Sequence, residues 1–178
     1  EIRQALDAER SFGTMSFPFF MTKTAPVSGS ESIMSYKCTY EGSVTKEKKD
    51  FRIKIQVPVT TVCPCSKAIS DRGAHNQRGI VSVTLQNSSL FWAEDVIQAI
   101  EESASSGLYS ILKRPDEKFV TEHAYDNPRF VEDVVREVYL ALKNFSKCEK
   151  PFSYFSVECE NFESIHNHNA YAYTEFAE

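Results

Sequence analysis

The chain has 178 residues, of which 42% are hydrophobic and 25% are charged, a composition typical of one globular domain and too polar for a membrane protein. Its net charge of -5 at pH 7 argues against a general nucleic-acid binder, although it leaves room for a local cationic pocket. No apolar run approaches the roughly 20 residues that span a bilayer, and neither end carries a signal or lipidation motif. We therefore expect a cytoplasmic protein with no membrane or nucleic-acid partner.

The cysteines form no regular framework. There are five, at positions 38, 63, 65, 148 and 159, and in a reducing compartment such residues remain thiols or bind metal. We expect no disulfides. The chain also opens on a helical pattern without an initiator methionine or an N-cap residue, so we expect that an N-terminal part is missing.

The first 30 residues predict a helix end followed by a strand. Ile2 and Leu6 form a short apolar stripe that stops before Gly13. The aromatic run at 15–21 then indicates a strand, and Pro26 and Gly29 mark a loop after it. That loop is either an ordinary surface connection or the lining of a pocket.

Three further strands are predicted before the first long helix. Apolar and polar residues alternate at 33–40 and again at 51–59, with a charged turn between them, which indicates a hairpin. Pro58 is expected to end regular pairing. A third strand covers 81–85 and is closed by the polar segment QNSS at 86–89.

Two helices follow. Apolar residues recur at helical spacing from Ala93 to Leu112, and Pro115 is expected to prevent any continuation. The second helix has Asn127 as its predicted N-cap and Pro128 at its first position. Its buried stripe consists of Val131, Val134, Val135, Val138 and Leu142. Glu132 lies beside this stripe, about 100° round the helix, and could point into a cleft.

The chain closes with strands at 152–160 and 169–177, joined by the segment NFESIHNH. An order of strands, helices and strands indicates an α+β fold, an antiparallel sheet with two helices packed on one face. No repeat or linker divides residues 1–178, so we predict one domain.

Residues 59–79, VTTVCPCSKAISDRGAHNQRG, carry the densest chemistry in the chain. We expect a non-periodic loop, and in an extended backbone Cys63 and Cys65 would project to the same side. His75 follows after enough residues to curl back toward them. The loop is thus half of a metal site, unless the cysteines are core residues and the histidine caps a turn.

A second cluster, formed by Glu163, His166 and His168, stands between the last two strands. Thiols, imidazoles and carboxylates together are typical of a catalytic metal site, where the metal lowers the pKa of a bound water. The cysteines outside the loop have no paired spacing, which favours an open catalytic site over a closed structural one. The full candidate set is Cys63, Cys65, His75, Glu117, Glu163, His166 and His168.

Four stretches of the chain together resemble one known family. They are FPFFMTKTAPVSG, VPVTTVCPCSKAISDRGAHNQRG, LKRPDEKFVTEHAYDNPRFVEDVVRE and ECENFESIHNHNAYAY. In this order they look like GTP cyclohydrolase type IB, a metal-dependent enzyme. The resemblance implies the tunnelling fold, in which subunits assemble into an oligomeric barrel with active sites at their interfaces.

The resemblance also implies roles for single residues. The metal ligands would be Cys63, His75, Glu117 and His166. Candidates for proton transfer or positioning near the metal would be Cys65, Glu163 and His168. Glu132 would bind the guanine ring through its N1 and N2 edge. The nearest cationic candidates for the triphosphate are Lys67, Arg78, Lys113 and Arg114.

The implied reaction is hydrolysis of GTP to 7,8-dihydroneopterin triphosphate and formate, the first step of folate biosynthesis. Zinc or manganese is the implied metal, with iron also compatible, and the implied assembly is a homo-oligomer, a tetramer. Family members usually carry a further N-terminal half that resembles a second copy of the fold, which is absent here. Two alternatives remain: a non-catalytic metal-stabilised pterin- or purine-binding module, and an enzyme of this fold that acts on a reduced pterin or another purine.

Overall fold

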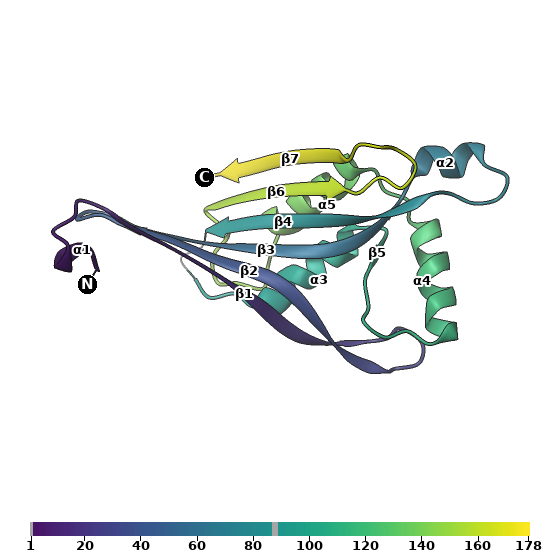
Figure 1. Cartoon of the computed structure of the whole chain (residues 1–178), viewed down its shortest axis with the longest axis horizontal. Helices are drawn as coiled ribbons and strands as arrows, with labels where there is room; N and C mark the ends of the chain where they lie inside the picture. Colours follow the sequence, from purple (N-terminus) through teal and green to yellow (C-terminus); the bar gives the residue numbers. More distant parts are fainter. Residues whose placement is uncertain (1, 87–88) are drawn as a thin grey trace.

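The computed structural model describes residues 2–86 and 89–178, which form an antiparallel sheet of seven strands with helices on one side (Figure 1). The strand order is β1-β2-β3-β4-β6-β7, and the short β5 pairs with β3. Every pairing is antiparallel, which confirms the predicted sheet. The strands are β1 (Ser11–Thr24), β2 (Glu31–Val44), β3 (Lys49–Val62), β4 (Asn76–Gln86), β5 (Ser106–Gly107), β6 (Tyr154–Asn161) and β7 (Ala170–Ala177).

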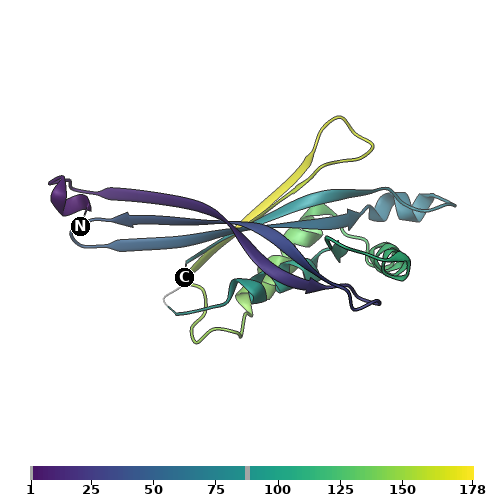
Figure 2. The same ribbon diagram turned by 60° about the horizontal axis from the view of Figure 1, so that its bottom comes forward.

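Two helices cover one face of the sheet and three stand at its ends. The covering helices are α3 (Ala93–Ser103) and α5 (Val131–Lys143), and they lie together on one side of the sheet in Figure 2. The short α1 (Ile2–Ala5) lies at one end of the long strands. At the opposite end of Figure 1 are α2 (Pro64–Ile69) and α4 (Arg114–Asp126).

The core lies between the sheet and its two covering helices. Ile55, Val57 and Val59 alternate with more exposed residues along β3 and are fully buried, as expected for a strand with one face in the core. The predicted apolar stripe of α5 is also buried, which confirms it. α3 packs against β3, and α5 packs against α3, β6 and β7, because each element presents its apolar side to the core.

The strands are longer than their patterns predict. Pro58 does not end pairing, because β3 continues to Val62 and Pro58 lies opposite Ile80. The pairing of β3 with β2 ends at Gln56, so on that side of Pro58 no β2 ladder requires an N–H group. The polar segment QNSS, predicted to close the third strand, includes residues 87–88, and the predicted N-terminal helix includes residue 1. These three residues lie outside the described residues.

The predicted loop at 59–79 is largely ordered secondary structure. β3 extends to Val62, α2 occupies Pro64–Ile69, and β4 begins at Asn76. Pro64 stands in the first turn of α2, where its fixed φ and missing N–H are favourable. The loop prediction failed because a helix of six residues is too short to show apolar periodicity.

The helix predicted from Ala93 to Leu112 ends at Ser103 instead. Ser105 and Ser106 are buried beyond it, and Ser106 pairs with β3. The backbone N–H of Val62 donates to the hydroxyl of Ser105 at 3.0 Å. This tertiary contact draws the chain out of the helix, although apolar residues continue at helical spacing.

The first helix does not continue through Pro115, as expected, but a separate helix that was not predicted, α4, begins at Arg114 with Pro115 in its first turn, where proline is tolerated. The Asp116 carboxylate accepts the N–H groups of Lys113, Val27 and Ser28 at 2.8–2.9 Å. It thereby ties the start of α4 to the turn between β1 and β2. Asn127, the predicted N-cap of the next helix, instead caps the C-terminus of α4, and α5 begins at Val131.

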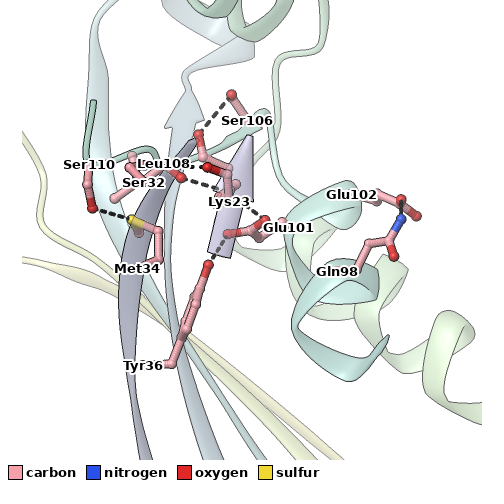
Figure 3. Close-up of polar contacts among 11 residues, drawn as sticks. Lys23, Ser32, Met34, Tyr36, Gln98, Glu101, Glu102, Ser106, Leu108 and Ser110 are labelled. Atoms are coloured by element: carbon pink, nitrogen blue, oxygen red, sulfur yellow. Dashed lines mark hydrogen bonds and ion pairs between the residues drawn. The ribbon is translucent and has the colours of Figure 1, made fainter. Parts of the chain in front are cut away.

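A buried polar cluster joins β1 and β2 to the end of α3 (Figure 3). Lys23 Nζ lies 2.6 Å from both Glu101 Oε2 and the carbonyl oxygen of Leu108. The Tyr36 hydroxyl donates to Glu101 Oε1 at 3.0 Å, and burial together with the Glu101 carboxylate raises the pKa of Tyr36. A Cβ atom on Gly107 would stand 2.9 Å from Lys23 Nζ, so glycine permits this close approach.

All five cysteines are free thiols, as expected. In the ranges 2–86 and 89–178, no helix is both long enough and apolar enough to cross a bilayer.

Candidate functional site

A pocket of about 270 Å³ lies where β3 and β6 end and where β4 and α5 begin. Its lining comes from three segments that are distant in the sequence. It includes most of the residues for which the sequence predicts a metal-binding, proton-transfer or guanine-binding role. Those lining it are Cys63, His75, Glu132, Glu163, His166 and His168. The two dense sequence clusters are therefore parts of one site.

Backbone contacts bring Cys63 and His75 to the same end of the sheet. They follow and precede the paired strands β3 and β4, and the N–H of Cys63 donates to the carbonyl oxygen of His75 at 3.1 Å. Ser66 stabilises the segment between Cys63 and His75. Its N–H donates to Cys63 Sγ at 3.4 Å, and its hydroxyl accepts the His75 N–H at 3.2 Å. The cysteine sulfur and the imidazole are thus positioned by local structure.

The orientation of the His75 ring is set by Gln77. The Gln77 amide nitrogen donates to the Thr61 hydroxyl at 2.9 Å, so its Oε1 faces His75 Nδ1 at 3.0 Å. Gln77 and Thr61 are both buried. Because Oε1 can only accept, this contact places a proton on Nδ1, so that in a neutral imidazole Nε2 is the nitrogen with the free lone pair. A histidine held through one nitrogen in this way is typical of a metal ligand.

The segment 161–168 forms the opposite wall. It begins at Asn161, which pairs with Gly79 of β4, and a Cβ on Gly79 would come within 2.6 Å of Asn161 Oδ1. Glycine at this position therefore lets Asn161 approach the neighbouring strand. Further along, the rings of His166 and His168 stack with centroids 5.2 Å apart, so both imidazoles lie at the pocket together.

Glu132 enters from the first turn of α5, next to the buried Val131. It lines the pocket, as its position beside the apolar stripe predicts. The site therefore combines a carboxylate on a helix with thiol and imidazole groups at strand ends.

Two residues of the predicted metal and proton-transfer set do not line this pocket. Cys65 is exposed on α2, because the backbone turns helical at Pro64 and the sulfurs of Cys63 and Cys65 do not share one side of an extended strand. Glu117 is exposed on α4. Of the equivalent pair of thiols, the structure brings only Cys63 to the pocket.

The four cations predicted for the triphosphate also lie outside the lining residues. Lys67 is engaged elsewhere: its Nζ donates to the Tyr125 carbonyl oxygen and lies 4.2 Å from the centre of the Tyr125 ring. The other three, Arg78, Lys113 and Arg114, are exposed. None of the four is brought to the pocket of this single chain.

Three polar residues that line the pocket were not predicted from the sequence. Gln77 and Asn161 were passed over because an isolated amide in a strand carries no pattern. Arg129, between α4 and α5, is the arginine that lines the pocket, and it resembled an ordinary solvated loop cation. Its position in the motif NPRFVED, three residues before Glu132, was the available signal.

The donor chemistry suits a metal ion. One thiol, three imidazoles and two carboxylates line the pocket, and zinc accepts all three kinds of ligand, while carboxylate and imidazole also suit manganese. Within the part of the chain that the structure describes, no three such side chains converge closely enough to hold an ion. The pocket thus supplies the ligand types without a closed coordination sphere.

Comparison with known proteins agrees with these features. Residues 1–172 match a family model described as type I GTP cyclohydrolase folE2. A GTP cyclohydrolase FolE2 from Fervidobacterium nodosum is 52% identical over 171 residues, covering 96% of this chain and 64% of that protein. The corresponding protein of Syntrophus aciditrophicus is 54% identical over 175 residues, with 98% and 67% covered. That of Methylobacillus flagellatus is 53% identical over 172 residues, with 97% and 63% covered.

The α+β fold and the pocket of thiol, imidazole and carboxylate groups define an α+β protein with a candidate active site. The chain belongs to the type I GTP cyclohydrolase folE2 family. It spans about two thirds of the length of the curated relatives that it matches.

Proposed function

We propose that this chain carries the active site of a GTP cyclohydrolase, which hydrolyses GTP to 7,8-dihydroneopterin triphosphate and formate at the start of folate biosynthesis. The observation that carries the proposal is one pocket that joins Cys63 and His75 to the segment 161–168 and to Glu132. The FolE2 names of relatives that are about half identical support it.

Cys63, His75 and His166 would hold a divalent metal, zinc or manganese, with iron also compatible. Bound there, the ion would supply a Lewis acid that makes water nucleophilic near neutral pH for attack on C8 of the purine. Because Glu117 is exposed on α4 and outside the lining of its own pocket, we propose that it completes the site of a neighbouring copy.

The remaining pocket residues would bind and protonate the substrate. Glu132 offers two carboxylate oxygens to the N1–H and N2–H donors of guanine. Glu163 is half-buried and His168 exposed, and each can move a proton to the ring nitrogen that departs when the imidazole opens. Cys65 takes no part in this scheme, since it lies outside the lining residues.

The proposed assembly is a tetramer with sites at subunit contacts, in which sheets join into a barrel. Two features support it. β1 and β7 stand at the two ends of the strand order, and an uncovered edge strand is a template for pairing. The face of the sheet without helices carries polar pairs such as Lys54 with Glu158 and Gln56 with Ser82, which suit a wet lumen. In such an assembly Lys113 and Arg114 of α4 could reach a neighbour's triphosphate.

We place the enzyme in the cytoplasm, where its five free thiols would persist.

A non-catalytic metal- or purine-binding module is the competing function. It is favoured by the lack of three converging ligands among the described residues.

Incubation with GTP and Mn²⁺ or Zn²⁺, followed by assay of formate and of the pterin chromophore, separates the two. The proposed function predicts both products, and a chelator abolishes them. Binding of metal and GTP without formate would establish the module.

A further inference from the structure

Arg129 has an unusual environment for a cation. Its Nε is buried and has no hydrogen-bond partner among the described residues. A buried donor without a partner loses the stabilisation that a hydrogen bond would give. No ion pair links Arg129 to Glu132 or Glu163 within the described chain, although all three line the same pocket. Nε is therefore available to an acceptor that the described residues do not provide.

A backbone hydrogen bond fixes where residue 129 stands. The Arg129 N–H donates to the carbonyl oxygen of Val62 at 3.0 Å, and Val62 immediately precedes Cys63. Three residues further on, Glu132 begins the other side of the pocket. Arg129 is thus anchored at the same pocket as the thiol proposed to hold the metal and the carboxylate proposed to hold the guanine.

The chemistry of guanine matches this order. If C8 lies toward Cys63 and the N1 and N2 edge toward Glu132, the two remaining sides of the purine are the O6 and N7 edge and the sugar edge. O6 and N7 are both acceptors, and arginine binds them with two parallel N–H groups, a pairing well known from guanine recognition in nucleic acids. A guanidinium has only donors, so it cannot pair with the 6-amino group of adenine.

We propose that Arg129 is a specificity-determining residue that donates to O6 and N7 of the guanine ring. This inference rests on the proposed function, and it adds a second recognised edge to the one assigned to Glu132. The two side chains, one acceptor and one donor, would together distinguish guanine from adenine. In this role Arg129 binds the purine and not the triphosphate.

The test compares binding of guanosine, 7-deazaguanosine and inorganic tripolyphosphate to the full chain by calorimetry, with chelator present to prevent turnover. Loss of N7 should weaken nucleoside binding to the wild type. In Arg129→Gln, guanosine binding should fall about tenfold to a hundredfold, the difference between guanosine and 7-deazaguanosine should vanish, and tripolyphosphate binding should persist. Arg129→Lys should not restore guanosine binding, because an ammonium lacks the planar fork.

Arg72→Gln serves as the matched control, since Arg72 is exposed after α2 and outside the pocket. If Arg129→Gln lost tripolyphosphate binding and kept guanosine binding, the guanidinium would serve the phosphates and the proposal would be overturned. Full guanosine affinity in Arg129→Lys would overturn it as well, because a positive charge without the planar fork would then suffice. If Arg129→Gln weakened the binding of guanosine and of 7-deazaguanosine by the same factor, the wild-type difference in affinity between the two ligands would remain. The role of Arg129 would then be purely structural. A wild type that forms pterin from GTP while Arg129→Gln binds guanosine normally would reject this inference alone. A wild type that binds no guanosine and releases no formate would reject the proposed function as well.

Discussion

His75 Nδ1 lies 3.0 Å from Gln77 Oε1, on an amide whose nitrogen is already committed to Thr61. This contact fixes both the tautomer and the direction of the imidazole, and it is the feature of the pocket that most resembles a preorganised metal site.

Replacing Gln77 with methionine keeps the side-chain length and removes the acceptor for Nδ1–H. We expect metal affinity to fall by about 10–100-fold, as is typical when such a partner is lost. Gln56→Met is the matched control, because Gln56 lies on the face of the sheet without helices and donates to Ser82 at 3.1 Å. A metal titration that gives equal affinities for both variants would contradict the role of Gln77.

Glu132→Gln replaces one carboxylate oxygen with an NH₂ donor that would face the guanine donors. We expect the dissociation constant for GTP to rise about tenfold or more, because one donor is left unpaired. Glu137→Gln on the same helix, outside the lining residues, should bind GTP as the wild type does. Unchanged affinity in Glu132→Gln would remove Glu132 from substrate recognition.

Gly107→Ala should destabilise the fold. The added Cβ would meet Lys23 Nζ at 2.9 Å and Glu101 Cδ at 3.0 Å, and neither atom can move freely because the ion pair also binds the Leu108 carbonyl. We expect a loss of about 1–3 kcal/mol in the free energy of unfolding by urea.

Gly13→Ala is the control for that measurement, since a Cβ atom added there would meet no neighbouring side chain or strand within 4 Å. Its stability should change by less than about 0.5 kcal/mol. Similar effects of the two substitutions would show that the close approach at Gly107 is not limiting.

The cysteines should differ sharply in reactivity. Burial raises the pKa of Cys38 to about 11, and burial together with Glu160 raises the pKa of Cys159 to about 12. At pH 8 both remain thiols, whereas the thiolate is the reactive form. Iodoacetamide followed by peptide mass spectrometry should modify the exposed Cys65 and spare Cys38 and Cys159 until denaturant is added. Rapid labelling of Cys38 in the native protein would contradict the described core.

Much of the sheet could be predicted because alternation along a strand is a local signal. The patterns at 51–59 and 81–85 correspond to β3 and β4. The helix α4 was missed because Pro115 has opposite meanings inside a helix and at its start. Asp116 decides in favour of a helix start, because its carboxylate binds Val27 and Ser28, which lie 89 and 88 residues away. No local pattern reveals such a contact.

The candidate site could be predicted in part for the same reason. Cys63, His75 and His166 belong to dense clusters, and residue chemistry marks them without knowledge of the fold. The family resemblance already ranked Cys63 above Cys65 as the ligand, whereas the physical reason that only Cys63 lines the pocket, the helical turn of the backbone at Pro64, is not visible in the sequence pattern. Arg129 could not be predicted, because the burial of its Nε results from tertiary contacts that its neighbours in the sequence do not reveal.

The two cysteines of the Cys-Pro-Cys motif provide the most direct test of the proposed metal-dependent site. The measurement is formate released from GTP by Cys63→Ala and Cys65→Ala, with the metal content of each determined by elemental mass spectrometry. The pocket geometry predicts that Cys63→Ala loses both the metal and turnover, while Cys65→Ala keeps both. Full formate release with normal metal content in Cys63→Ala would contradict the assignment of this pocket as the catalytic site.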